Sequence, residues 1–202
     1  IKWATGMFNL LFHEVPKLWK GFPLSARLHY PLAGSFYLNG VASGLTIWLP
    51  VPFLFFQAYA VEMPLGGFLA HVLPYAASVF LIHAWVQRWY SHREEIGFPW
   101  RSMFLEKGTW HVYAMGLWNS LRGREVPYIP TPKTRGTGAA LSWVWPHWLA
   151  IGASLAAVVW ALATYHRLDE GALLMMVFAL SNVLLLLPVA WTGTFGFREA
   201  RP

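Results

Sequence analysis

The chain alternates long uncharged segments with short charged ones. Four segments contain no Asp, Glu, Lys or Arg: residues 28–61, 63–87, 136–166 and 171–197. Each is longer than the roughly 20 apolar residues that a helix needs to cross a bilayer. A water-soluble domain of 202 residues has no use for four such segments. The pattern therefore predicts an all-α membrane protein with four transmembrane helices.

The four helices fall into two pairs, residues 33–90 and 143–197, and residues 198–202 begin a cytoplasmic tail. Pro50 and Pro52 lie in the outer half of the first span. A proline inside a helix has no backbone N–H and leaves a carbonyl without its usual partner. We therefore expect the first span to kink there.

Two further segments resemble amphipathic helices that lie on the membrane surface. In the region 1–32, Met7, Leu10, Leu11 and Leu18 recur near helical spacing. The second such helix, at 100–121, belongs to a cytoplasmic region that covers 91–125. Gly108 and Gly116 within it favour a bend or close packing on another backbone.

Residues 126–142 come next as a loop, because three prolines and two glycines in 126–138 do not allow regular structure.

Charge is distributed unevenly between the two sides of this topology. If both ends are cytoplasmic, Arg167 is the one residue of the 15 Lys and Arg that lies in an outer loop. This agrees with the positive-inside rule, so the net charge of +6 indicates topology rather than nucleic-acid binding. The sequence has no cysteine, which excludes disulfides and thiolate sites.

The chain shows no catalytic constellation of its own and no metal-ligand cluster: neither a Ser-His-Asp arrangement, nor a phosphate-binding glycine loop, nor a carboxylate cluster is visible. Histidines inside or near the spans are candidates because polar groups in lipid are often functional. His71, His83 and His147 are in this position. They leave open a non-catalytic four-helix anchor that binds haem or quinone.

Aromatic residues make up 17% of the chain, and several lie inside or at the mouth of spans. They fit core packing and lipid contact, and equally a path on which the apolar faces of sugars stack. The loop segment Tyr128-Ile-Pro-Thr-Pro-Lys133 combines rigid prolines with a hydroxyl and a cation. It is either an ordinary connector or a loop that closes over a diphosphate.

Three motifs in order resemble a known family. The chain opens on Ile1-Lys-Trp-Ala-Thr-Gly-Met7, which is similar to the end of a Gln-x-x-Arg-Trp motif and the residues directly after it. His71-Val-Leu-Pro-Tyr75 resembles a Tyr-Val-Leu-Pro-His segment, and the loop at 128–133 resembles Phe-x-Val-Thr-Pro-Lys. Together they resemble the C-terminal membrane half of bacterial cellulose synthase catalytic subunits and other processive family-2 glycosyltransferases.

The resemblance implies roles for particular residues. Trp3 would bind the acceptor sugar, and Lys2 would contact the nucleotide diphosphate, although lysine stands where the family has arginine. The region 126–142 would be a gating loop. Further nucleotide contacts would come from Tyr128, Thr131 and Lys133, and channel-lining aromatic side chains from Phe36, Tyr37 and Phe53.

The resemblance also implies what this chain lacks. The catalytic domain, with its Mg²⁺ or Mn²⁺, would precede Ile1, so no catalytic residue, metal or cofactor is expected in this fragment, which alone should be inactive. The implied partners are a UDP-sugar, most commonly UDP-glucose, the growing polysaccharide, the N-terminal catalytic half and membrane lipid. A periplasmic accessory subunit is a further candidate. The implied location is the bacterial inner membrane, with several passes and both ends cytoplasmic.

Overall fold

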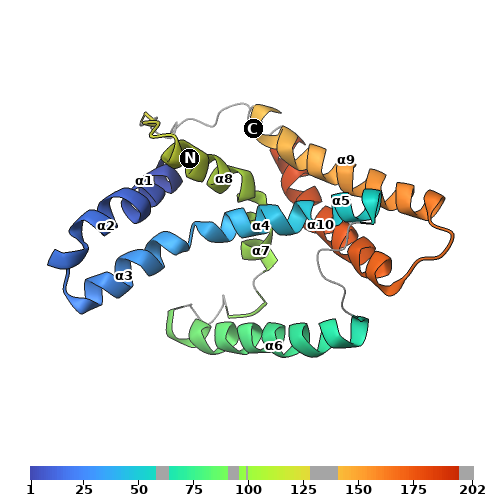
Figure 1. Ribbon diagram of the computed structural model, residues 1–202, viewed down its shortest axis with the longest axis horizontal. Coiled ribbons are helices and arrows are strands. Elements are labelled where there is room, and N and C mark those ends of the chain that lie inside the picture. The colour runs from blue at the N-terminus through green and yellow to red at the C-terminus, as the bar shows by residue number, and fades with distance from the viewer. Residues whose placement is uncertain (58–63, 91–95, 99, 128–140, 196–202) are drawn as a thin grey trace, which may run out of the picture.

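The computed structural model describes residues 1–57, 64–90, 96–98, 100–127 and 141–195 (Figure 1). The described residues form helices and no strand. Four helical stretches are long and apolar enough to cross a membrane: Leu24–Phe56, Leu65–Trp89, Trp143–Thr164 and Glu170–Phe195. The prediction of an all-α chain with four helices able to span a membrane is therefore confirmed.

The N-terminal region is a series of short helical pieces rather than one helix. Pro16 lacks the N–H that would continue the regular hydrogen-bond pattern, and a π-helical segment precedes it. Pro23 then stops the series, and a long helix begins at Leu24, earlier than the predicted start at 33. The pieces are α1 (Lys2–Asn9), the π-helical segment (Leu10–Glu14), α2 (Val15–Leu18) and a 3-10 turn (Trp19–Gly21).

The first long stretch consists of α3 (Leu24–Ser35), α4 (Leu38–Trp48) and α5 (Pro50–Phe56). Its 33 residues would extend about 50 Å at 1.5 Å per residue, more than the roughly 30 Å of bilayer hydrocarbon. The combined length of α4 and α5 matches that thickness, so α3 extends beyond it.

The helix is interrupted at Leu49, immediately before Pro50. Pro50 cannot donate to the carbonyl of Thr46 four residues earlier. Asn182 from the last helix donates instead, with its Nδ2 3.1 Å from Thr46 O. The expected free carbonyl is therefore present and is satisfied by a side chain of another span.

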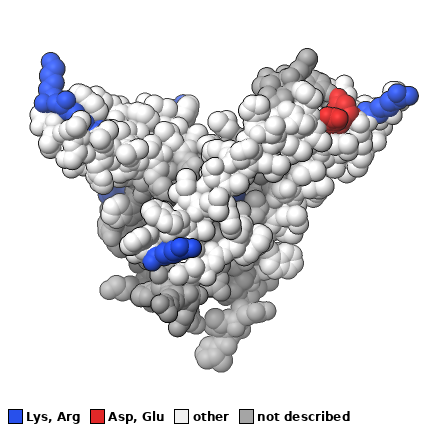
Figure 2. Space-filling view, turned by 90° about the horizontal axis from the view of Figure 1, so that it is seen from below, with Lys and Arg blue, Asp and Glu red and all other residues white. Residues whose placement is uncertain are grey.

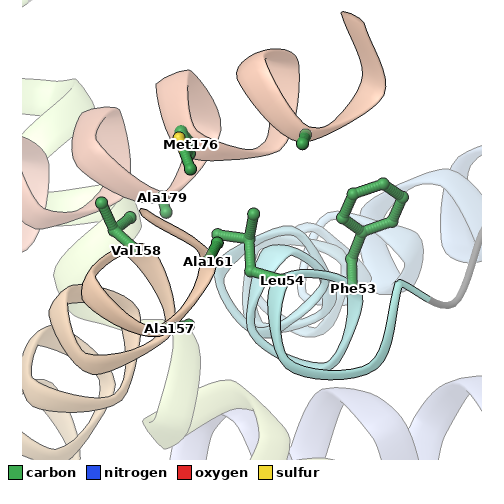
Figure 3. Packing of buried hydrophobic residues seen from close by; sticks show 8 residues of the cluster. Phe53, Leu54, Ala157, Val158, Ala161, Met176 and Ala179 are labelled. Atoms are coloured by element: carbon green, nitrogen blue, oxygen red, sulfur yellow. The ribbon is translucent and has the colours of Figure 1, made fainter. Parts of the chain in front are cut away.

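The last two helices, α9 (Leu141–Thr164) and α10 (Glu170–Phe195), pack on the first span. Figure 3 shows α5 against both, with Phe53 and Leu54 facing alanines of the other two helices. Small residues at such contacts let helix backbones approach closely, which is how helices associate in lipid. A second cluster joins α4 to the same pair: Ile47, Val144, Ala150, Ile151, Leu186 and Ala190.

The predicted helix at 100–121 is two helices, α7 (Trp100–Gly108) and α8 (Trp110–Leu121). Both glycines lie in close contacts: a Cβ on Gly108 would meet Val189, and one on Gly116 would meet Ala4. Thus α7 packs on α10, while α8 packs on α1 and α4. The two segments that the sequence predicts to lie on the membrane surface therefore contact each other through α1 and α8.

In contrast, α6 (Leu65–Tyr90) lies apart from the other helices (Figure 1). None of the residues in its apolar window is buried. Its N-terminal end contacts α10 through Phe68 and Phe178, whose ring centroids are 6.0 Å apart. Figure 2 shows few charged side chains on this face of the described molecule, most of them at the far ends of its two arms.

The described residues that flank the two predicted outer loops lie at one end of the bundle. Tyr165 Oη donates to Leu54 O at 2.6 Å, and Leu65 N donates to Glu170 Oε2 at 2.9 Å. The residues that flank both predicted outer loops are thus neighbours. This arrangement is the one that four antiparallel spans require.

Candidate functional site

An aromatic cluster lies where α1, α8 and the junction of α3 and α4 meet. Tyr37 is at its centre, edge-to-face with Phe8 at 6.3 Å and with Tyr113 at 5.2 Å between ring centroids. Phe8 is fully buried. Gly40 makes room for this packing, because a Cβ there would overlap the Tyr113 side chain. The cluster fixes α1 against the transmembrane helices.

Trp3 projects from α1 on the side away from this packing. Its side chain is 79% exposed, whereas the next residue, Ala4, is buried against α8. Lys2, Trp3, Gly6 and Met7 line a groove of about 370 Å³. An exposed indole beside a cation is a suitable surface for the apolar face of a sugar ring.

The three aromatic residues expected to line a channel differ in their surroundings. Phe36 is 62% exposed and lies edge-to-face with Tyr37 at 5.7 Å between ring centroids. Tyr37 is half-buried in the aromatic cluster. Phe53 is 7% exposed and packs in the core between α5, α9 and α10 (Figure 3). Only Phe36 of these three presents a largely open ring.

The predicted loop residues Tyr128, Thr131 and Lys133 lie outside the described residues. Among the predicted site residues that the structure describes, Lys2 and Trp3 line one groove. Phe36 and Tyr37 form a second, separate pair. Phe8 and Tyr113 hold the second pair in place, and the sequence interpretation missed both. Their signal was the small-residue pattern in the first span, where Gly40 and Gly44 leave space for aromatic side chains of α8.

A polar junction connects α7 to the first span. Lys107 Nζ donates to Thr46 Oγ1 at 3.0 Å, and Asn39 Nδ2 donates to Glu106 Oε1 at 3.0 Å. Burial lowers the pKa of Lys107, and the neighbouring Glu106 carboxylate partly opposes this shift. Since Asn182 bonds the carbonyl of the same Thr46, three helices meet through polar groups at this residue.

The three histidines considered for haem ligation occupy different environments. His71 is exposed and bonds its own helix, with Nδ1 2.7 Å from Gly67 O. His83 lies on the same helix, and its Nε2 is 2.8 Å from Gln87 Nε2. His147 is buried on α9, where its ring contacts His111 of α8. The buried pair is thus His111 and His147, and the sequence interpretation did not consider His111.

No protein-family model and no solved structure matches this chain. The site must therefore be interpreted from its own geometry and from the motifs in the sequence.

Proposed function

We propose that this chain is the membrane part of a processive β-glycosyltransferase of the cellulose synthase type. Together with a catalytic half that carries Mg²⁺ or Mn²⁺, it would polymerise a UDP-sugar, with UDP-glucose as the first candidate. It would also translocate the polysaccharide across the bacterial inner membrane. In this proposal the chain supplies the acceptor platform, part of the channel and the gating loop at 126–142.

The observation that carries the proposal is the position of Trp3. This tryptophan is held on a helix that is packed through Ala4 and Phe8, yet its own ring is 79% exposed over a groove. An exposed ring on a fixed backbone can stack on a sugar without first ordering itself. Since stacking tolerates sliding, a polymer can step past such a ring.

The order of elements supports the same proposal. Helices α1 and α8 lie side by side, and each precedes a pair of helices able to span a membrane. The exposed ring of Phe36 lies at the start of the first of these pairs. Thr131 and Lys133 would contact the nucleotide when the loop closes, through a hydroxyl and a cation suited to phosphate oxygens.

The test uses the parent enzyme, with the catalytic half present, in lipid nanodiscs. UDP release and polymer length are followed with UDP-glucose and Mg²⁺, and then with other UDP-sugars. Trp3→Ala and Thr131→Ala are compared with Trp89→Ala, which removes a similarly exposed tryptophan (76%) from the end of α6. We expect the first two substitutions to abolish long polymer and the third to leave its length unchanged.

The outcomes separate the enzyme class from the assigned residues. If the parent polymerises and Trp3→Ala matches Trp89→Ala, the acceptor platform is wrong while the enzyme class stands. If the parent is inert with every UDP-sugar, the proposed class is wrong. In that case the absorption spectrum should be recorded, because a Soret band lost on His71→Ala would identify a haem anchor instead.

A further inference from the structure

Two buried histidine rings from different helices meet between α8 and α9. His111 is 8% exposed and His147 is 3% exposed. Their ring centroids are 4.8 Å apart, and the ring planes are nearly perpendicular, at 85°. The two histidines are 36 positions apart in the chain, so the fold of the protein brings them into contact.

Three of the four ring nitrogens have no hydrogen-bond partner in the described residues. His147 Nε2 lies 2.8 Å from Gly108 O, and since a carbonyl only accepts, this nitrogen carries the proton. His147 Nδ1 in the neutral ring is therefore a bare acceptor, and it has no partner. Both nitrogens of His111 are also unpartnered. Buried polar groups normally have a partner, so these three atoms need an explanation.

Both rings are suited to donate a lone pair. His111 is buried with both ring nitrogens unpartnered among the described residues, and one nitrogen of a neutral imidazole is always an acceptor with a free lone pair. A backbone carbonyl that accepts from one ring nitrogen fixes the tautomer and turns the other nitrogen into a metal ligand. The Gly108 carbonyl has this relation to His147.

We propose that His111 and His147 bind one late first-row transition-metal ion, of the zinc class, between α8 and α9. The ligands are His147 Nδ1 and one ring nitrogen of His111. Two imidazoles on one tetrahedral ion at 2.0–2.1 Å from each nitrogen place their ring centroids about 5 Å apart. The observed separation of 4.8 Å is close to this value.

The same geometry distinguishes this site from a haem site. Two histidines on opposite faces of one haem iron would have ring centroids about 6 Å apart, with the macrocycle between them. The described residues contain no group of three or more His, Cys, Asp or Glu that could hold a metal. In the proposed site, water or an added ligand therefore completes the coordination. Its effect is to fasten α8 to the transmembrane pair.

The experiment uses the whole 202-residue chain without a histidine tag, in nanodiscs, after removal of metals with EDTA. Zn²⁺ binding is measured by calorimetry, and Co²⁺ is used as a second probe because its visible absorption reports coordination by nitrogen. The variants are His111→Gln and His147→Gln, which keep the size of the side chain approximately. His71→Gln is the matched control, because His71 is exposed on α6.

We expect one Zn²⁺ per chain, affinity lowered by at least about tenfold in each of the two variants, and no change in the control. Zn²⁺ should also raise the melting temperature of the wild type and not that of the two variants. Absence of saturable binding to the wild type would overturn the proposal, as would equal binding by all four proteins. Circular dichroism of the metal-free variants distinguishes loss of a ligand from loss of the fold. Neither readout depends on the proposed glycosyltransferase activity.

Discussion

Two transmembrane helices of this chain, α10 and α6, have the same length and opposite environments. Each has 26 residues and one internal proline. One face of α10 is buried, with residues three or four positions apart: Ala172, Met176, Ala179, Asn182, Leu186 and Ala190. The apolar window of α6 buries none of its residues. Hydrophobicity therefore does not explain why one helix is buried and the other is not, since both are apolar enough to span a membrane.

The difference lies in where their polar groups bond. In α6, His71 bonds the Gly67 carbonyl and Ser78 the Pro74 carbonyl, both within the helix, while Gln87 near its C-terminal end bonds Gly97. In α10, Asn182 bonds the Thr46 carbonyl of another span. A helix whose polar side chains are satisfied by its own backbone can be surrounded by lipid, whereas one that bonds outward depends on its neighbour. Substitutions on the two kinds of helix should therefore have unequal effects.

The largest difference is expected for glycine. Gly40→Ala would place a Cβ against Tyr113, with Tyr113 Cβ only 2.6 Å away, so α4 and α8 must separate. We expect a loss of about 3 kcal/mol in the free energy of unfolding. Gly66→Ala on α6 meets nothing within 4 Å and is the control, with a gain of up to about 1 kcal/mol from helix propensity. Denaturant titration in mixed micelles measures both. Equal stability of the two variants would show that α8 does not pack on α4 in this way.

A buried leucine should have the next largest effect. Leu186 on α10 is 1% exposed and packs against Ile47 and Val144, whereas Leu184 on the same helix is 68% exposed. Because lipid is as apolar as leucine, Leu186→Ala loses packing rather than transfer energy, and we expect about 2 kcal/mol. Leu184→Ala should cost less than about 0.5 kcal/mol. The same unfolding assay compares the pair, and a larger loss for Leu184→Ala would contradict the packing of α10.

A smaller effect is expected for the hydrogen bond between spans. Asn182→Ala leaves the Thr46 carbonyl without a partner beside Pro50, and such bonds in membrane proteins contribute about 1 kcal/mol. Pro50→Ala restores a backbone N–H four residues after Thr46, so it should reduce the cost of Asn182→Ala. A double-mutant cycle measures this coupling. Strict additivity of the two substitutions would mean that Asn182 does not act through the carbonyl that Pro50 frees.

The charge-free segments predicted the four long helices correctly, because the bilayer requires long apolar helices whatever their partners. The sequence did not predict that α6 stands apart, since lipid and protein neighbours select similar residues. Nor did it place the start of the first helix at Leu24. Arg27 lies inside this helix, where it bonds the carbonyls of Lys20 and Phe22.

For the candidate site, the motif resemblance singled out Trp3, but the 79% exposure of its ring follows from the packing that buries Ala4 and Phe8 of the same helix. Sequence motifs could not predict that Phe53 is a core residue while Phe36 is open, because both are aromatic residues of one apolar segment. The facing helix decides between the two positions. His111 was missed for a related reason, since its partner His147 is 36 positions away.

The smallest effect should be one of pH on the contact between α7 and the first span. Burial lowers the pKa of Lys107 below that of the unfolded chain, near 10.5. The unfolded state therefore binds this proton more tightly, and stability rises with pH up to that value. Lys107→Met should flatten the rise in the free energy of unfolding as the pH approaches 10.5 from below, compared with Lys20→Met on the exposed N-terminal turn. If both variants keep the slope of the wild type, Lys107 is solvated in the folded protein, and its ammonium group does not hold α7 to α4.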